Sequence, residues 1–332
     1  NEINLSKLDL FLPLQAFFTS DFLLERAEVS FKKNDIKDLT KITRIFLPRI
    51  INKQIKKIIE NGTLEGEFII PFEADGSIGK NYGFSGKIKD ASVNLTKKFK
   101  IKNLNTTIKH EKQNQFEALI TSGLLFNIDL TGTQINFINE KNIKKINTLL
   151  NTKGNINFDQ IKKISSIFGF KLNNFEEIQA KANLISKIDF QINKKFKIKD
   201  LIYSTSGDIN YLKINSNKSK FVKKFLPEYN NEIIIKDSKI NFVNSKSNQI
   251  TELKGLIKLQ DKFNAFAVKE TYDHNKKFFN INGNIELTDS KVEFLNLNYV
   301  KELKKKAELI FDVNFILNKY YNINKLNFLS DK

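Results

Sequence analysis

The sequence has 332 residues, with 55 Lys and Arg against 37 Asp and Glu, which gives a formal net charge of +18. It contains no Cys, no Met and no Trp, which excludes disulfides, thiolate metal sites and cysteine catalysis. Because there is no initiating Met, we expect the sequence to be part of a longer chain. Only three of its cations are Arg, the residue that nucleic-acid readers favour, so we expect no nucleic-acid partner.

Alternation with a period of two residues is the main pattern along the chain. Apolar side chains recur at every second position, as expected of strands that have one buried and one solvated face. The segments that show it, in chain order, are 64–70, 86–96, 116–121, 124–131, 182–192, 233–243, 253–259, 279–287, 292–297 and 309–317. The connections are short and polar, as at 111–114 and 273–276, and this predicts an antiparallel meander.

Helical spacing of apolar residues is confined to short islands. These lie at 51–59, 143–150, 161–168, 221–226 and 300–306. Gly62, Gly169 and Pro227 follow three of them as stop signals. The predicted fold class is therefore mainly β: a long twisted antiparallel sheet curled into an apolar groove, with a few short inserted α-helices.

An internal repeat is the most informative feature of the sequence. Four segments share an alternating strand, a Lys/Asn turn and an Ile-x-x-Leu word that opens the next strand; they are 27–39, 91–104, 190–201 and 315–326. The word Phe-Leu-Pro recurs at 11–13, 46–48 and 225–227. We interpret residues 1–332 as one elongated, repeat-built region with approximate units 1–150 and 151–332.

This pattern resembles the AsmA-like superfamily of bacterial envelope proteins, especially its YhdP and TamB type. Leu47-Pro48, the helical island 51–59, Asn61-Gly62 and the Leu64-x-Gly66 strand follow the order of the YhdP branch, whereas Leu226-Pro227 lacks the helix and glycine that should follow. The resemblance implies a bridge-like lipid-transfer protein of the periplasm. It would be anchored in the inner membrane by a helix upstream of Asn1, and its groove would carry phospholipid acyl chains toward the outer membrane.

The apolar positions of the three clearest strands are the candidates for lining such a groove. They are Leu184, Ile188, Phe190, Phe279, Ile281, Ile285, Leu309, Phe311, Val313 and Phe315. The expected partners are phospholipid acyl chains, together with the inner and outer membranes or their proteins. The alternative is a structural scaffold segment of the envelope, in which the same apolar face is filled by the protein's own side chains, because periodicity does not distinguish lipid from a second sheet.

No motif of catalysis is present. The sequence has neither a phosphate-binding glycine loop nor a nucleophile elbow. His110 and His274 lie in polar stretches that predict solvated hairpin tips, and Glu176-Glu177 predicts a solvated face. Lysine runs such as Lys304–Lys306 are typical of residues that protect sheet edges from aggregation. We therefore expect no enzymatic activity, no catalytic residue, no bound metal and no cofactor.

Overall fold

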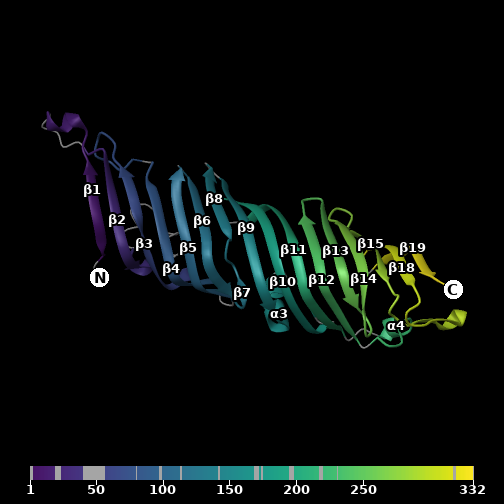
Figure 1. The fold of residues 1–332 in the computed structure, drawn as a ribbon. Coiled ribbons are helices and arrows are strands. Elements are labelled where there is room, and N and C mark those ends of the chain that lie inside the picture. Colours follow the sequence, from purple (N-terminus) through teal and green to yellow (C-terminus); the bar gives the residue numbers. More distant parts are fainter. Residues whose placement is uncertain are drawn as a thin grey trace. The chain divides into compact units, whose positions relative to one another are not determined.

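The structure is a computed structural model that describes residues 3–18, 24–39, 57–79, 81–96, 99–112, 114–140, 143–167, 172, 175–193, 198–216, 220–229, 231–316 and 319–331. It is mainly β, with antiparallel strands and a few short helices, which confirms the predicted fold class (Figure 1). The chain divides into two compact units. Unit 1 comprises residues 1–151 and 189–199, and unit 2 comprises residues 152–188 and 200–332.

Unit 1 is an antiparallel meander in which β1 to β6 each pair with the next strand, and β8 pairs with both β6 and β9. Its elements are β1 (Leu5–Phe11), η1 (Leu14–Phe17), β2 (Arg26–Asp35), α1 (Ile36–Leu39), β3 (Ile59–Pro71), β4 (Gly83–Thr96), β5 (Phe99–Lys112), β6 (Gln115–Leu125), β7 (Ile128–Asp129), β8 (Gln134–Glu140) and the first part of β9 (Ile143–Ile156).

Unit 2 is a second antiparallel meander, in which β11 to β15 pair in succession, β15 pairs with β18, and β18 pairs with β19. The small hairpin β16–β17 is inserted between β15 and β18. The elements that follow β9 are α3 (Phe158–Ile167), β10 (Phe175–Ile192), β11 (Ile198–Ser216), α4 (Lys220–Lys223), β12 (Glu232–Asn244), β13 (Asn248–Lys258), β14 (Phe263–Asp273), β15 (Phe278–Glu286), β16 (Val292–Phe294), η2 (Leu295–Leu297), β17 (Tyr299–Lys301), β18 (Ala307–Ile316) and β19 (Tyr320–Ser330). Strands β9, β10 and β11 have residues in both units.

Two of the predicted helices are wrong. The island 143–150 forms strand β9, where Ile146 lies opposite Phe137 of β8; a short apolar run fits a helix and a strand almost equally well, and pairing with β8 decides it. The island 300–306 forms β17 and a turn instead.

The remaining helical islands fared differently. The helix predicted at 161–168 is confirmed over residues 161–167, as part of α3, and residue 168 lies outside the described residues. The island 221–226 is helical only at its start, as α4, and then turns. Most of the island 51–59, together with Leu47-Pro48, lies outside the described residues.

Two predicted strands end early. The predicted strand 124–131 is interrupted: β6 ends at Leu125, the chain turns at Phe126, whose φ of 56° is left-handed, and only Ile128–Asp129 is extended again, as β7. The predicted strand 292–297 is extended only as far as Phe294, after which the turn η2 begins.

The four repeat copies differ in burial. In the first two copies the shared apolar positions are buried: Ala27, Ile36, Leu39, Ala91, Ile101 and Leu104. In the last two they are exposed: Ile198, Leu201, Ile323 and Leu326. In the first copy, moreover, Ile36-x-x-Leu39 forms helix α1 rather than opening a strand. The recurrent sequence pattern therefore does not fix a recurrent environment.

The core of unit 1 is filled by its own side chains. A buried cluster joins Ile36, Ala91, Ile101, Leu104, Ile120 and Leu130. Beside it, an aromatic row crosses neighbouring strands: the rings of Phe68 and Phe84 are 4.6 Å apart between centroids, those of His110 and Phe116 are 4.2 Å apart, and Phe116 meets Phe137 at 6.2 Å. The cluster and this row make up the apolar face of unit 1.

The core of unit 2 has two parts. One joins Ile235, Ile257 and Phe266 across β12, β13 and β14. The other joins Leu226, Tyr229, Leu287, Val292 and Ala307, so it packs the segment after α4 and the hairpin β16–β17 against the sheet. The functional candidates lie around this second cluster.

Candidate functional site: the apolar face and cavity of unit 2

Seven of the ten predicted lining residues lie on one face of β15 and β18. Phe279 is opposite Phe315, Ile281 opposite Val313, and Ile285 opposite Leu309. Residues opposite each other in an antiparallel pair point to the same side, so these side chains share a face. The seventh, Phe311, lies opposite Gly283, and a Cβ at Gly283 would come within 3.2 Å of its ring, which means that the ring covers the glycine.

This face extends across the sheet of unit 2. The register carries one row of residues from Ile240 through Leu253, Val268 and Gly283 to Phe311. We call the surface of unit 2 that contains this row its apolar face. All ten predicted residues are half-buried.

The three predicted residues of β10 lie on a different strand from the seven residues of β15 and β18. Gly207 of β11, which lies opposite Ile240, approaches Leu184 so closely that a Cβ there would be 3.0 Å from the Leu184 Cα. Leu184 is thus next to the row that contains Ile240. Ile188 is four residues further along β10, so its side chain points to the same side of the sheet as that of Leu184. Both belong to the apolar face. Phe190 lies on the same strand but in unit 1, and it is not brought together with the others.

An aromatic row also borders the apolar face of unit 2. The rings of Tyr272 and Phe279 stack at 4.3 Å between centroids, and those of Phe279 and Phe315 stack at 4.8 Å. Offset stacks of this kind contribute about 0.5–1.5 kcal/mol beyond area burial. Two predicted residues are thus part of a packed row rather than free to line a groove.

Under the hairpin, the apolar face is hollow. A cavity of about 370 Å³ has a wholly apolar lining. Its walls are Val222, Phe225, Leu226, Leu259, Ile285, Leu287, Val292, Phe294, Leu309, Ile323, Leu326 and Phe328. Of the ten predicted residues, only Ile285 and Leu309 are among them. Ile323 and Leu326 are half exposed or more, so the β19 wall reaches the surface.

Part of the wall that the sequence did not predict comes from two inserted segments, while Ile323, Leu326 and Phe328 come from β19. Phe225 and Leu226 belong to the recurrent Phe-Leu-Pro word and enter from the segment after α4, while Val292 and Phe294 enter from the hairpin. The two insertions are joined, because the Glu293 N–H donates to the Phe225 carbonyl at 2.9 Å. Burial in the same cluster raises the pKa of the Tyr229 phenol.

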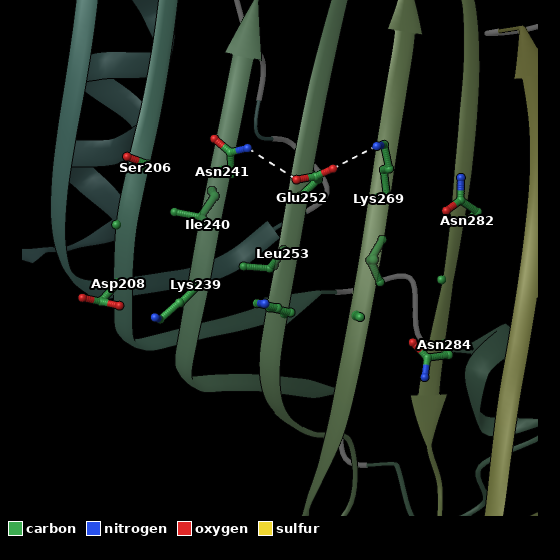
Figure 2. A pocket seen from close by; sticks show the side chains of 15 residues that line it. Ser206, Asp208, Lys239, Ile240, Asn241, Glu252, Leu253, Lys269, Asn282 and Asn284 are labelled. Atoms are coloured by element: carbon green, nitrogen blue, oxygen red, sulfur yellow. Dashed lines mark hydrogen bonds and ion pairs between the residues drawn. The ribbon is translucent and has the colours of Figure 1, made fainter.

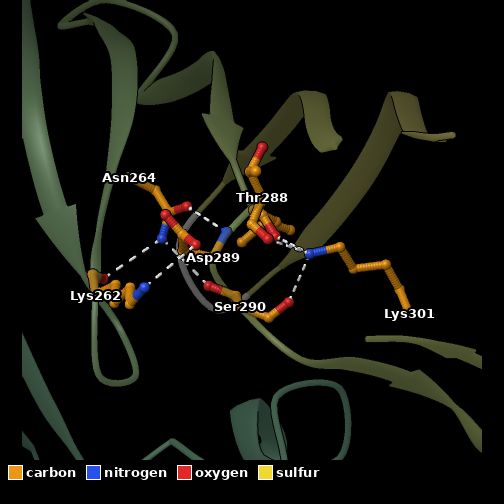
Figure 3. Close-up of polar contacts among 7 residues, drawn as sticks. Lys262, Asn264, Thr288, Asp289, Ser290 and Lys301 are labelled. Atoms are coloured by element: carbon orange, nitrogen blue, oxygen red, sulfur yellow. Dashed lines mark hydrogen bonds and ion pairs between the residues drawn. The ribbon is translucent and has the colours of Figure 1, made fainter. Parts of the chain in front are cut away.

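A buried lysine fixes the root of the hairpin (Figure 3). The Lys301 side chain is 1% exposed, and its Nζ donates to the carbonyls of Leu287, Thr288 and Ser290 at 2.5, 2.7 and 2.8 Å. Burial lowers the pKa of its ammonium, and the charge of Asp289 counters that in part. Three carbonyls satisfy the three donors of an ammonium, so this lysine is a structural clamp.

The opposite face of the same strands is polar. A hollow of about 760 Å³ lies between rows of side chains on β11 to β15 (Figure 2). The row from Ile240 to Gly283 also contributes to its lining. Among the polar side chains there, Glu252 is paired with Lys269 at 2.9 Å and accepts a hydrogen bond from Asn241 at 3.4 Å. These two partners lower the pKa of its carboxyl. Such a surface of paired charges and amides is suited to solvent.

One carboxylate interrupts the apolar face. Glu270 lies between Thr251 and Ile281 in the register and is half-buried. Within the described residues its carboxylate has no ion-pair or hydrogen-bond partner. A charge in this position indicates that this part of the apolar face is not sealed from water.

The prediction for His110 is wrong. It lies within β5, is 3% exposed, and stacks on Phe116 while donating from Nδ1 to the Gln115 carbonyl at 2.6 Å. Polar neighbours suggested a hairpin tip, but alternation turns this side chain inward into the aromatic row. His274 does lie in a turn, where it is half-buried and its Nε2 is 3.1 Å from the Asn244 Oδ1.

Within the described ranges, no cluster of three or more His, Asp or Glu side chains is arranged to hold a metal ion. No helix in the same ranges combines the length and the apolar character needed to cross a bilayer. Comparison of the chain with known protein families, with curated proteins and with solved structures found no match.

Proposed function

We propose that unit 2 binds the acyl chains of lipids in its apolar cavity and along its apolar face. The observation that supports this is the cavity itself, because about 370 Å³ with no polar lining offers a ligand nothing but hydrocarbon contact. The volume falls within the roughly 300–1,000 Å³ of small-molecule sites. Such a cavity favours a flexible alkyl chain over any ligand that needs hydrogen bonds.

The energetics agree with this choice of ligand. Each methylene removed from water contributes about 0.8 kcal/mol, so ten methylenes would contribute roughly 8 kcal/mol before the costs of ordering the chain. No specific polar contact is then required. The fully packed walls at Leu287 and Val292 contrast with the exposed wall at Ile323 and Leu326, which gives a chain a side from which to enter.

The cellular role is the wider part of the proposal. We propose that the chain is a groove segment of a bridge-like protein that carries phospholipid between the inner and outer membranes of a bacterial envelope. The periplasmic location and the inner-membrane anchor outside this sequence rest on the AsmA-like resemblance alone. We also propose that the segment is not an enzyme.

The scaffold alternative is favoured by a different observation, namely the core of unit 1. There Ala91 is 0% exposed and the neighbouring Ile and Leu side chains are buried. If protein side chains also filled the cavity of unit 2, the chain would have only a structural role. The two readings therefore differ in whether the cavity of unit 2 is occupied by lipid.

The experiment compares the two faces of unit 2. A photo-crosslinking amino acid replaces Leu309 in the cavity wall or, as the matched control, Asn284 on the polar face. The purified proteins are irradiated and extracted, and lipid adducts are identified by mass spectrometry. We expect adducts at position 309 and none at position 284.

A charge variant completes the test. Leu309→Asp places an unpaired carboxylate in the cavity, at a cost of several kcal/mol to any bound chain, whereas Lys254→Asp, at an exposed position on the polar face, leaves the cavity unchanged. Co-purifying phospholipid should fall for the first variant and persist for the second, with folding checked by circular dichroism. A folded wild-type protein that carries no phospholipid and crosslinks only to protein would support the scaffold.

A further inference from the structure

The tip of the hairpin β16–β17 exposes large apolar side chains. In the turn η2 Leu295 is 71% and Leu297 is 75% exposed, and Val300 on the returning strand is 48% exposed. In Figure 1 this hairpin is the yellow-green loop that extends away from the strands beyond α4. Leucines scattered singly on a surface are ordinary, but a projecting turn that carries two of them is a contiguous apolar tip.

The exposure at the tip is not the result of a loosely held loop. On the inner side of the same hairpin Val292 is 2% exposed, and the Phe294 ring meets those of Phe328 and Phe225 at 5.2 and 6.0 Å. The root is clamped by the buried Lys301 ammonium (Figure 3). A rigid base therefore holds Leu295 and Leu297 at the surface, where each is more than two thirds exposed.

Two hydrogen-bonded side chains reinforce the base. Gln260 exchanges hydrogen bonds with the backbone of Lys291, at 2.9 Å from its Nε2 and 2.8 Å to its Oε1. Asn264 accepts from the Asp289 N–H at 3.1 Å and donates to the Ser290 hydroxyl at 3.3 Å. The loop that carries the hairpin is thus tied to β14 and to the turn before it.

Lysines surround the root. Lys304, Lys305 and Lys306 are exposed and lie in the turn that follows β17, where the Lys304 N–H donates to the Thr288 carbonyl at 3.0 Å. They are not on a sheet edge, which is where the sequence had suggested a protective role. Lys223 and Lys224 are also exposed and come just before Phe225, whose carbonyl the hairpin contacts.

Carboxylates balance part of this charge. Glu293 is paired with Lys291 at 3.2 Å, and Glu228 and Glu302 lie within electrostatic range of the same lysine. Asp289 lies within 3.9 Å of the Lys262 ammonium. Lys223, Lys224 and Lys304–Lys306 are five exposed lysines, and they exceed the two carboxylates that remain, Glu228 and Glu302. The root of the hairpin is therefore a basic collar below an apolar tip.

We propose that the hairpin β16–β17 docks the protein on an anionic lipid bilayer, with Leu295 and Leu297 entering the interface. A strand of three residues spans about 10 Å, so the collar lies about that far behind the tip. Interfacial elements bury their apolar side about 5–10 Å deep and keep their lysines among the headgroups. Tip and collar match that arrangement. The proposal goes beyond acyl-chain binding and does not require that the cavity hold a lipid.

Because the protein has no Trp, a single introduced Trp is an unambiguous probe. Leu297→Trp is titrated with vesicles of phosphatidylcholine and with vesicles that also contain phosphatidylglycerol. We expect a blue shift of its fluorescence with the anionic vesicles and little change with the neutral ones. Ile185→Trp, at a half-exposed position on a strand of unit 2, should show no shift. No shift of the Leu297→Trp emission with anionic vesicles would overturn the proposal.

Substitutions test the two components separately in vesicle sedimentation. The double variant Leu295→Ser/Leu297→Ser should lose at least about tenfold in partitioning. The variant with Lys304, Lys305 and Lys306 all changed to Gln should also lose about tenfold or more, since each lysine near such a surface contributes about fivefold before screening. Circular dichroism checks that both remain folded, and single substitutions at the same positions replace any variant that does not.

The matched controls are Ile185→Ser/Val243→Ser for the leucines and Lys239, Lys254 and Lys277 changed to Gln for the lysines; all are exposed positions in unit 2. Both controls should sediment with anionic vesicles like the wild type. If the controls lose as much as the hairpin variants, the attraction is a property of the whole +18 charge and the proposal is wrong. It is equally wrong if the hairpin variants bind like the wild type, because another surface then carries the contact.

Discussion

The two units have similar antiparallel sheets but differ in what lies against the apolar face of each sheet. Each has an antiparallel meander, an aromatic row and glycines at which neighbouring strands approach closely: Gly66 opposite Gly86 in unit 1, and Gly207 and Gly283 in unit 2. In unit 1 the space next to the row is filled by Ala91 and the buried side chains around it. In unit 2 the corresponding side of the sheet is covered by inserted segments that leave a cavity.

The difference lies in what covers the sheet, rather than in the strands themselves. Within the described residues of unit 1, helix α1 covers part of the sheet, and its Ile36 and Leu39 are both buried. In unit 2 the cover is built from the segment after α4 and from a hairpin whose inner side chains, such as Val292, bridge over β15 and β18. The hairpin of unit 2 is held at its base by Lys301 and can therefore extend over a cavity. Helix α1 of unit 1 is held by its own apolar side chains, and these fill the space beneath it.

Truncation of equivalent repeat residues should show the largest contrast. Leu104 and Leu326 end the Ile-x-x-Leu words of two repeat copies, but Leu104 is 8% and Leu326 59% exposed. We expect Leu104→Ala to lower the free energy of unfolding by about 3 kcal/mol and Leu326→Ala to lower it by less than about 1 kcal/mol. Urea denaturation followed by circular dichroism measures both. Equal losses would mean that the last repeat is covered in solution.

Removal of the clamp should have the next largest effect, and only in unit 2. Lys301→Met removes a donor from three carbonyls; those of Leu287 and Thr288 keep the N–H groups of Ser290 and Lys304, whereas the Ser290 carbonyl loses its ammonium partner, which costs about 1–3 kcal/mol. Lys304→Met, at an exposed position in the following turn, is the control and should cost little. Limited proteolysis gives the local readout, because cleavage within 291–303 should become faster in the Lys301 variant. Unchanged cleavage would show that Gln260 and Asn264 hold the root without the lysine.

The strands could be predicted because one face of each is apolar and the other polar. The alternation in β10, β15 and β18 survives in the register of the sheet. The pattern failed where it was ambiguous, as in β9, whose apolar residues also fit a helical period, and where a left-handed residue such as Phe126 ended a strand early. Local sequence carries little information on such events, since cross-strand partners decide them.

The site could be predicted only in part. The residues of β15 and β18 were found because they belong to the clearest strands, and Ile285 and Leu309 do line the cavity. Its other walls were missed because they depend on contacts distant in sequence, such as the Glu293 N–H to the Phe225 carbonyl. The local sequence does not indicate that β15 pairs with β18 rather than with β16. The cavity beneath the hairpin β16–β17 could therefore not be inferred.

Substitutions that enlarge a side chain slightly should destabilise the filled core of unit 1 but not the cavity wall of unit 2. Ala91→Val adds two methyl groups where Ala91 is 0% exposed and closely approached by Gly62, so it should destabilise by about 1–3 kcal/mol. Val222→Leu adds one methylene in the wall of the cavity and should be neutral or stabilise by up to about 0.8 kcal/mol. Thermal and urea unfolding provide the comparison. A destabilising Val222→Leu would indicate that the cavity collapses or is occupied in solution.

The last comparison concerns one ionisable side chain on each apolar face. His110 in unit 1 is stacked and hydrogen-bonded, whereas Glu270 in unit 2 is half-buried among Thr251 and Ile281. His110→Leu removes a stack and leaves the Gln115 carbonyl without its donor, so we expect a loss of about 1–2 kcal/mol in the free energy of unfolding.

Glu270→Leu has the opposite expected sign, because it replaces an unpartnered carboxylate with a side chain that matches the apolar face. A gain of about 0.5–1 kcal/mol is expected, together with more phospholipid retained through purification. Glu252→Leu on the polar face is the control; it loses the Lys269 pair and should destabilise by less than about 1 kcal/mol. If Glu270→Leu destabilises instead, the carboxylate has a partner in solution, and the apolar face of unit 2 is covered there as that of unit 1 is.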